Sequence, residues 1–137
     1  MSNKILKAGA LFSGIGGFCL GFEQAGIKTV WAIENNPQSV ATYVNNIKGV
    51  RIIEDAGVPA SITDITVDKY NLEPVDVLHA GFPCQSFSQA GERKGFEDPR
   101  GQLFFEIIRL VEEFKDNCMI HIRQIKSYLN VSVLDHL

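Results

Sequence analysis

The chain reads AGALFSGIGGF from Ala8 to Phe18, an apolar run that leads directly into a cluster of glycines. The first five residues predict a buried strand, and Gly17–Ala25 predicts a short helix that Gly26 ends. Glycines suit the turn between them, because the backbone must bend sharply and let a ligand approach without a Cβ in the way. Since free N–H groups at a helix start favour negative charge, the loop is a candidate site for a negatively charged group.

Strand and helix patterns continue to alternate outward from this loop. Further strands are predicted at Thr29–Ile33, Val50–Ile53 and Val75–Ala80. Asn36 and Pro37 form an N-cap and first-turn pair, which predicts a helix to about Asn46. A longer helix is predicted from Asp98–Pro99, with an apolar face made of Phe104, Ile107, Ile108, Val111 and Phe114. Alternation of this kind is typical of a parallel sheet with helices on its faces, so we expect an α/β fold with an open, doubly wound sheet.

Composition sets the broad class. The chain has 137 residues, 45% hydrophobic and 21% charged, which indicates a single globular domain. No apolar run reaches the ~18 residues that a membrane span needs, so no membrane partner is expected. The three cysteines cannot all pair with one another, which favours a reduced, cytoplasmic setting. The three histidines have no ligand-like spacing, so no metal is expected, and the net charge of -3 argues against a stand-alone nucleic-acid binder.

Two acidic residues follow predicted strands. Glu34 ends the second strand, where nucleotide-binding sheets place a carboxylate on ribose hydroxyls. The alternative is a tight strand–helix turn beside a solvated glutamate, since the glycine loop lacks the third glycine of Gly-x-Gly-x-x-Gly and has Cys19 there. Asp64, followed by Ile65, is a second acidic candidate. Its alternative is a helix cap, because it stands just before Thr66.

Residues 81–91 read GFPCQSFSQAG and follow the strand predicted at Val75–Ala80. Cys84 should therefore lie at the carboxyl end of the sheet, where open α/β folds bind ligands. A free cysteine is commonly a small buried hydrophobe, but the polar residues that follow argue against burial here. A thiol beside exposed backbone N–H groups can have a lowered pKa and react as a thiolate nucleophile.

Five segments, taken in order, resemble the motifs of the DNA (cytosine-5)-methyltransferases of bacterial restriction–modification systems. They are Phe12–Phe18, Glu34, Asp64–Ile65, Gly81–Gly91 and Gly95–Phe104. A short glycine loop occurs in many folds, whereas GFPCQSFS followed closely by DPRGQLF is typical of this family. The resemblance covers about Leu11 to Phe114 and implies the amino-terminal part of the catalytic domain. It also implies a Rossmann-like S-adenosylmethionine-dependent methyltransferase fold, here as a truncated open parallel sheet with helices on both faces.

The resemblance implies that S-adenosylmethionine is the cofactor. The glycine backbone of the loop would lie against the methionine part, and Phe12 against the adenine. Glu34 would accept hydrogen bonds from both ribose hydroxyls, which needs two acceptor oxygens, and Asn35 would lie beside the adenine. The loop residues so implied are Phe12, Gly14, Gly16 and Gly17.

The later motifs would complete the pocket. By resemblance, Asp64 would accept from the exocyclic amine of the adenine, and Ile65 would pack on its ring. Pro83 and Leu103 would close the pocket.

The same resemblance makes Cys84 the nucleophile that adds to C6 of a flipped-out cytosine. Base flipping is needed because C5 and C6 cannot be reached inside the stack. Gln85 and Ser86 belong to the nucleophile loop on the substrate side, and Arg100 would help to order that loop. The alternative for Arg100 is an ion pair with Asp98 at the helix start.

Parts of the family pattern are absent from the sequence. After Phe114 we find no Glu-Asn-Val segment, whose glutamate holds N3 of the cytosine, and no target-recognition domain. We therefore expect residues 1–117 to be the amino-terminal part of the catalytic domain and residues 118–137 to be a divergent tail, from a truncated or frame-shifted gene. DNA would be bound through the missing half in a complete enzyme. The chain alone is expected to be inactive and to need a second polypeptide that carries the remaining motifs. We also expect it to form a homodimer through its uncovered sheet edge.

Two other functions stay open at this point. The chain could be a non-catalytic relic that folds without methylating anything. A nicotinamide-dependent Rossmann enzyme is disfavoured, because the third glycine is missing and the Pro-Cys-Gln segment has no role in it.

Overall fold

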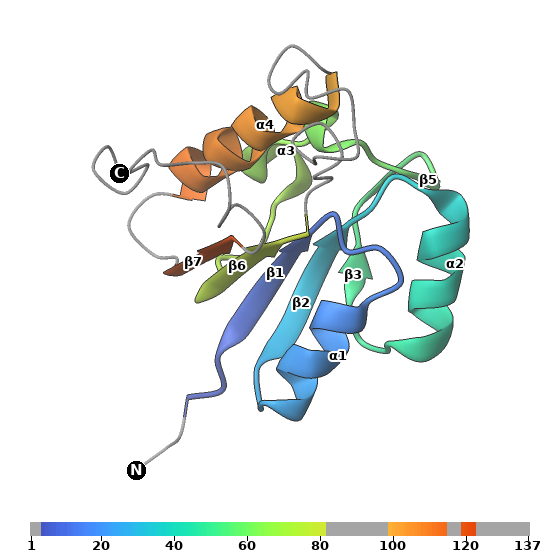
Figure 1. Cartoon of the computed structure of the whole chain (residues 1–137), viewed down its shortest axis with the longest axis vertical. Coiled ribbons are helices and arrows are strands. Elements are labelled where there is room, and N and C mark those ends of the chain that lie inside the picture. The colour runs from blue at the N-terminus through green and yellow to red at the C-terminus, as the bar shows by residue number, and fades with distance from the viewer. Residues whose placement is uncertain (1–3, 82–98, 115–118, 123–137) are drawn as a thin grey trace, which may run out of the picture.

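The computed structural model of the chain describes residues 4–81, 99–114 and 119–122 (Figure 1). A five-stranded parallel sheet lies at its centre, in the order β3-β2-β1-β6-β7. The strands are β1 (Lys7–Leu11), β2 (Lys28–Ile33), β3 (Arg51–Ile52), β6 (Val77–Ala80) and β7 (Met119–Ile122). The helices are α1 (Gly17–Gln24), α2 (Pro37–Asn46), the 3-10 turn η1 (Ile62–Asp64), α3 (Val67–Tyr70) and α4 (Pro99–Phe114).

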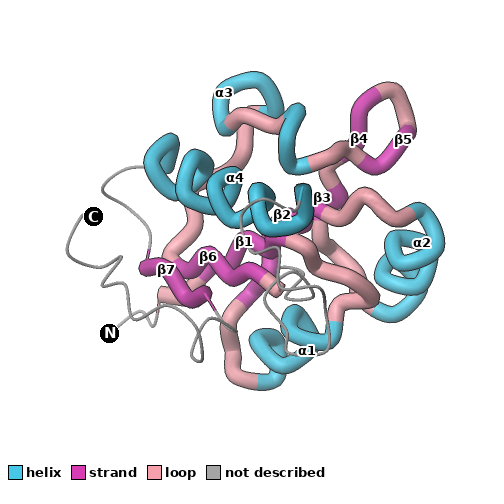
Figure 2. Tube along the Cα trace, turned by 45° about the horizontal axis from the view of Figure 1, so that its top comes forward, coloured by secondary structure: helices cyan, strands magenta, loops and turns pink. Residues whose placement is uncertain are grey.

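Helices cover both faces of the sheet (Figure 2). On one face, Ala10 of β1 packs with Cys19 of α1 and Tyr43 of α2. On the other face, the next residue of β1, Leu11, joins a larger core that includes Ile107 of α4. Successive side chains of a strand point to opposite faces of its sheet, so β1 contributes to both cores. This arrangement confirms the expected open, doubly wound sheet.

Trp31 of β2 fills the larger core. Its ring stacks on Phe114, with 5.7 Å between ring centroids and 6° between ring planes. The indole Nε1 donates to the carbonyl oxygen of Glu73 at 2.9 Å, which satisfies the polar edge of a buried ring. A Cβ on Gly9 would stand 2.3 Å from this ring, so Gly9 is the residue that gives Trp31 its space.

Most predicted elements are present within a residue or two. The helix from Pro37 to Asn46 has the predicted bounds, and residues 119–122 of the tail form β7. The predicted strand Val50–Ile53 is only two residues long, and it is followed by a small antiparallel pair, β4 (Glu54–Asp55) and β5 (Val58–Pro59), that was not predicted. Within the described part, no helix has the length and apolar character needed to cross a bilayer.

Candidate functional site

The glycine loop turns the chain from β1 into α1 by left-handed backbone conformations. The φ angles are +53° at Phe12, +55° at Gly14 and +93° at Gly16. The amide N–H of Ser13 donates to the carbonyl oxygen of Ile33 at 3.1 Å, which joins the loop to the end of β2. Phe12 is half-buried against the larger core. A left-handed conformation is costly for a residue with a Cβ, so its presence at Phe12 marks a backbone that its surroundings hold in place.

The glycines of this loop have different surroundings. A Cβ on Gly16 would stand 2.2 Å from Cδ1 of Ile47 and 2.9 Å from the ring of Tyr43, so α2 and its end close on this residue. A Cβ on Gly14 or Gly17 would meet no atom within 4 Å. Gly16 therefore serves helix packing, whereas Gly14 and Gly17 leave open backbone that a ligand can approach. Sequence reasoning missed Tyr43 of α2 and Ile47, the residue that follows this helix, although residues four apart lie on one face of a helix.

Glu34 connects the loop to the start of α2. Its Oε2 accepts from the amide N–H of Gly14 at 2.9 Å, and its Oε1 accepts from that of Asn36 at 2.8 Å. The Asn36 side chain in turn caps α2 by accepting from the amides of Gln38 and Ser39 at 3.0 and 2.9 Å. The Glu34 side chain is half-buried, and Asn35 beside it is exposed. Since a carboxylate has about four acceptor positions, each oxygen keeps room for a further donor.

Asp64 and Ile65 differ in exposure. Asp64 ends η1 and is exposed, whereas Ile65 is fully buried in the larger core. The cap of the following helix is Thr66, whose Oγ1 accepts from the amide of Lys69 at 3.2 Å. The helix-cap alternative for Asp64 is therefore wrong. The structure assigns Ile65 to core packing and leaves Asp64 as the member of the pair that faces solvent.

The carboxyl ends of three strands meet beside the glycine loop. Leu11 is aligned with Ile33 of β2 on one side and with Ala80 of β6 on the other. The amide of Gly81 donates to the carbonyl oxygen of Leu11 at 3.2 Å, so the residue that leads into the Pro-Cys segment lies at the end of β1. This edge, called the carboxyl edge below, therefore carries the loop at Phe12–Gly17, Glu34 and Gly81.

The predicted residues of the Pro-Cys segment, Pro83, Cys84, Gln85 and Ser86, lie outside the described residues. Arg100 belongs to the first turn of α4, and its side chain is likewise outside them. Leu103 is half-buried and packs against the larger core.

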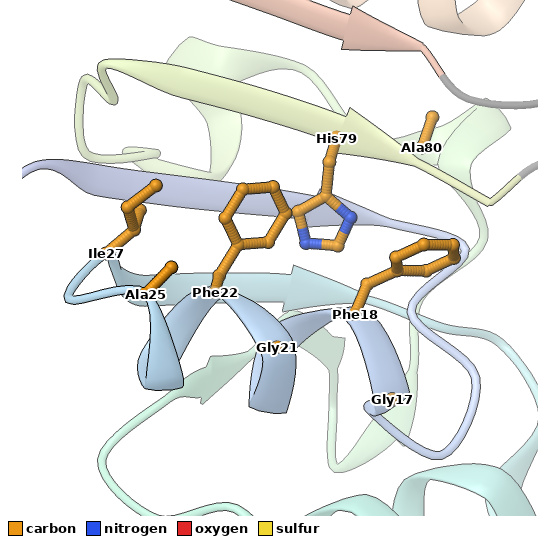
Figure 3. Close-up of a pocket in the computed structure, with 8 residues that line it drawn as sticks. All are labelled: Gly17, Phe18, Gly21, Phe22, Ala25, Ile27, His79 and Ala80. Carbon is orange, nitrogen blue, oxygen red and sulfur yellow. The ribbon is translucent and has the colours of Figure 1, made fainter.

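A separate pocket of about 280 Å³ lies between α1 and β6 (Figure 3). Phe18 and Phe22 project from α1 toward the buried imidazole of His79, whose ring centroid is 4.9 Å from that of Phe22. Sγ of Cys19 lies 3.7 Å from Nε2 of His79. Burial raises the pKa of the Cys19 thiol, so this cysteine is not a thiolate at neutral pH. In the described ranges, no three His, Cys, Asp or Glu side chains gather as a metal site would require.

Comparisons with known proteins agree on one family. The family model described as C-5 cytosine-specific DNA methylase matches residues 6–120. The type II methyltransferase M.Bsp6I of Bacillus sp. (strain RFL6) is 48% identical over 109 residues, which are 78% of this chain and 32% of the relative. The type II methyltransferase M.AquIA of Picosynechococcus sp. is 36% identical over 134 residues, which are 96% of this chain and 52% of the relative.

Two solved structures have the same fold. The Dnmt2 methyltransferase of S. pombe is 27% identical, with a TM-score of 0.61 over 87% of this chain and 36% of that one. A DNMT2 mutant of Spodoptera frugiperda is 25% identical, with a TM-score of 0.60 over 95% of this chain and 38% of that one. The chain thus spans between about a third and a half of the length of these relatives. Its parallel sheet with helices on both faces is the S-adenosylmethionine-dependent methyltransferase fold, of which the chain covers a part.

Proposed function

The chain belongs to the C-5 cytosine-specific DNA methylase family, and from this premise we propose that it supplies the cofactor and nucleophile part of an enzyme that methylates C5 of cytosine in DNA. S-adenosylmethionine would be the methyl donor. The observation that carries the proposal is the link between Glu34 and Gly14, which places a carboxylate with spare acceptor capacity beside open glycine backbone at the carboxyl edge.

The residues present fit this cofactor. Gly14 and Gly17 leave space that a Cβ would narrow, and the buried hydroxyl Oγ of Ser13 in the same loop has no hydrogen-bond partner among the residues that the structure describes. Asp64 is an exposed carboxylate. Its Oδ1 accepts a long hydrogen bond, of 3.4 Å, from Oγ1 of Thr63. We propose that Glu34 accepts from the ribose hydroxyls and that Asp64 accepts from the adenine amine, with Phe12, Asn35 and Leu103 around the base. When bound, the cofactor supplies an electrophilic methyl group.

Cys84 is proposed as the nucleophile. Its thiolate would form a bond to C6 of a flipped-out cytosine, which makes C5 nucleophilic enough to take the methyl group from the sulfonium sulfur of the donor, with S-adenosylhomocysteine as the leaving group. Loss of the C5 proton to a base then breaks the bond between Cys84 and C6 and restores the aromatic ring. Pro83, Gln85, Ser86 and Arg100 would shape and order the loop that presents the thiol. Because the chain spans about a third of M.Bsp6I, we propose that the remaining motifs and the DNA-recognition part come from outside residues 1–137.

A chimera tests the proposal. In M.Bsp6I, the segment of 109 residues that this chain matches would be replaced by the chain's own residues, and host DNA would be read by bisulfite sequencing. The expected result is 5-methylcytosine in the DNA of the host cell. The chimera with Cys84→Ser should produce none, and intact M.Bsp6I, with its own segment, serves as the positive control. A chimera that binds S-adenosylhomocysteine but leaves every cytosine unmethylated would contradict the proposal.

A further inference from the structure

Arg109 of α4 makes hydrogen bonds to three different residues. Its Nη2 donates to the carbonyl oxygen of Ile62 at 2.9 Å, and its Nε donates to Oε2 of Glu106 at 2.8 Å. Its Nη1 donates to Oε1 of Glu113, one turn further along α4. Burial disfavours the charged guanidinium, but the bonds to Glu106 and Glu113 outweigh this effect and raise the pKa of Arg109. The guanidinium is therefore held in one orientation by carboxylates on both sides of it.

Glu113 makes a second contact with the same part of the chain. Its Oε2 accepts from the amide N–H of Val67, the first residue of α3, at 2.7 Å. Arg109 and Glu113 therefore hold Ile62 and Val67, and Asp64 lies between these two attachment points. The side chains of Arg109 and Glu113 are 32% and 28% exposed, so solvent screens these bonds less than it would on an open surface.

The turn that carries Asp64 is held unevenly. The amide of Asp64 donates to the carbonyl oxygen of Ser61 at 3.0 Å, whereas the next hydrogen bond of the turn, from the amide of Ile65 to the carbonyl oxygen of Ile62, is 3.4 Å long. Arg109 donates to the same oxygen from 2.9 Å with a charged group, and charge-assisted bonds are the stronger kind. The position of the Asp64 backbone therefore depends on α4 as well as on the turn itself.

We propose that Arg109, braced by Glu106 and Glu113, is a positioning residue that fixes Asp64 for recognition of the adenine amine of the cofactor. This inference rests on the proposed function, in which Asp64 accepts from that amine. It also joins the cofactor side of the site to α4, the helix that follows the Pro-Cys segment in the sequence.

The test compares two ligands that differ at the adenine amine. The full chain would be titrated calorimetrically with S-adenosylhomocysteine and with S-inosylhomocysteine, which has a carbonyl oxygen in place of the amine. The wild-type chain should prefer the adenine ligand by roughly 10-fold or more, the usual effect of a hydrogen bond to a charged group. Arg109→Met and Asp64→Ala should each remove most of this preference, and the double variant should lose no more than Asp64→Ala alone.

Control variants separate positioning from general loss of fold. Glu113→Gln removes the negative charge that holds the Arg109 guanidinium, with little change of volume. It should weaken the preference for the adenine ligand, and it provides a test even if Arg109→Met does not fold. Glu112→Gln makes the same change at the exposed neighbouring residue and should leave the preference intact. A preference that survives Arg109→Met and Glu113→Gln but not Asp64→Ala would overturn this inference and leave the proposed function standing. A preference that Asp64→Ala does not alter, or no binding by the wild type, would overturn the proposed cofactor site itself.

Discussion

At the scale of single residues, Gly16 and Gly17 separate packing from ligand access. They are adjacent, yet Gly16 has a left-handed backbone and closes against Ile47 and Tyr43, whereas Gly17 opens toward free space. One position therefore needs glycine for the fold, and the other can take a Cβ without a clash.

Gly16→Ala should lower the free energy of unfolding by at least about 2 kcal/mol. A left-handed residue with a Cβ costs ~1–2 kcal/mol, and overpacking adds ~1–3 kcal/mol. Gly17→Ala is the matched control, and it should keep or raise stability by up to about 1 kcal/mol because alanine favours helix. Urea unfolding of both variants measures the difference. Equal stabilities would show that α2 does not close on Gly16 as described.

Sequence reasoning at this scale identified Glu34 but not all of its contacts. The position of Glu34 after a strand is a pattern of the printed residues, whereas its bonds to Gly14 and Asn36 depend on how two loops meet in space. Arg109 could not be identified for the same reason, since its partner Ile62 lies 47 positions away. Residue type and local spacing predict candidates, and tertiary contacts decide which neighbours hold them.

At the scale of elements, Asp76 connects the start of β6 to the start of β1. Its side chain accepts from Lys4 and, at 2.9 Å, from the amide of Lys7, while its own amide donates to the carbonyl oxygen of Lys7 at 2.9 Å. The hydrogen bond from Lys4, followed by that from the Lys7 amide, lowers the pKa of Asp76 below its usual value. The charged carboxylate thus stabilises the pairing of β6 with β1.

Asp76→Asn should reduce stability at pH 7, and the reduction should shrink in acid. A carboxyl group whose folded pKa is lowered contributes stability above its unfolded pKa of about 3.9, and this contribution is lost as the pH falls through the folded value. The two proteins would be unfolded in urea at pH 7, 5 and 3. The difference in unfolding free energy between wild type and Asp76→Asn should be the same at pH 7 and pH 5 and smaller at pH 3. Exposed Asp68→Asn serves as the control. If the loss of stability in Asp76→Asn did not change with pH, the charge of the carboxylate would not be its cause.

Elements were predictable where their signals are local. Asn36 and Pro37 mark the start of α2 within two residues, and the helix has its predicted bounds. The β4–β5 pair, η1 and α3 were not predicted, because each is four residues or shorter and too short for a hydrophobic period to appear.

At the scale of the whole molecule, the outer strands of the sheet are β3 and β7 in the ranges that the structure describes. An outer strand with an unpaired side can pair with another chain, so the homodimer expected from the sequence stays our prediction. Sedimentation velocity of the full chain should show a dimer, whereas the chain ended at Lys115, which lacks β7 and the apolar residues after it, should sediment as a monomer. A well-folded monomeric full chain would mean that residues 123–137 leave no such surface open.

Residues 1–137 alone should not transfer methyl groups to DNA. They include no Glu-Asn-Val segment, so charge that builds on the pyrimidine after attack by Cys84 has no acid to neutralise it. Such a group contributes ~10²–10⁴ in rate. Incubation with labelled S-adenosylmethionine and duplex DNA should give no more label than the Cys84→Ser control. Incorporation at the rate of a full-length relative would contradict this prediction.

The central claim, that the carboxyl edge is a cofactor site built on Glu34, is tested most directly by titration calorimetry with S-adenosylhomocysteine. We expect weak but measurable binding by the wild-type chain. Glu34→Ala should abolish it, and Glu34→Gln, which keeps one acceptor oxygen, should weaken it by roughly 10-fold or more. Circular dichroism of each variant would establish that the fold is kept. Tight binding that neither substitution changes would mean that the ligand sits elsewhere, and no binding by a folded wild-type chain would contradict the account.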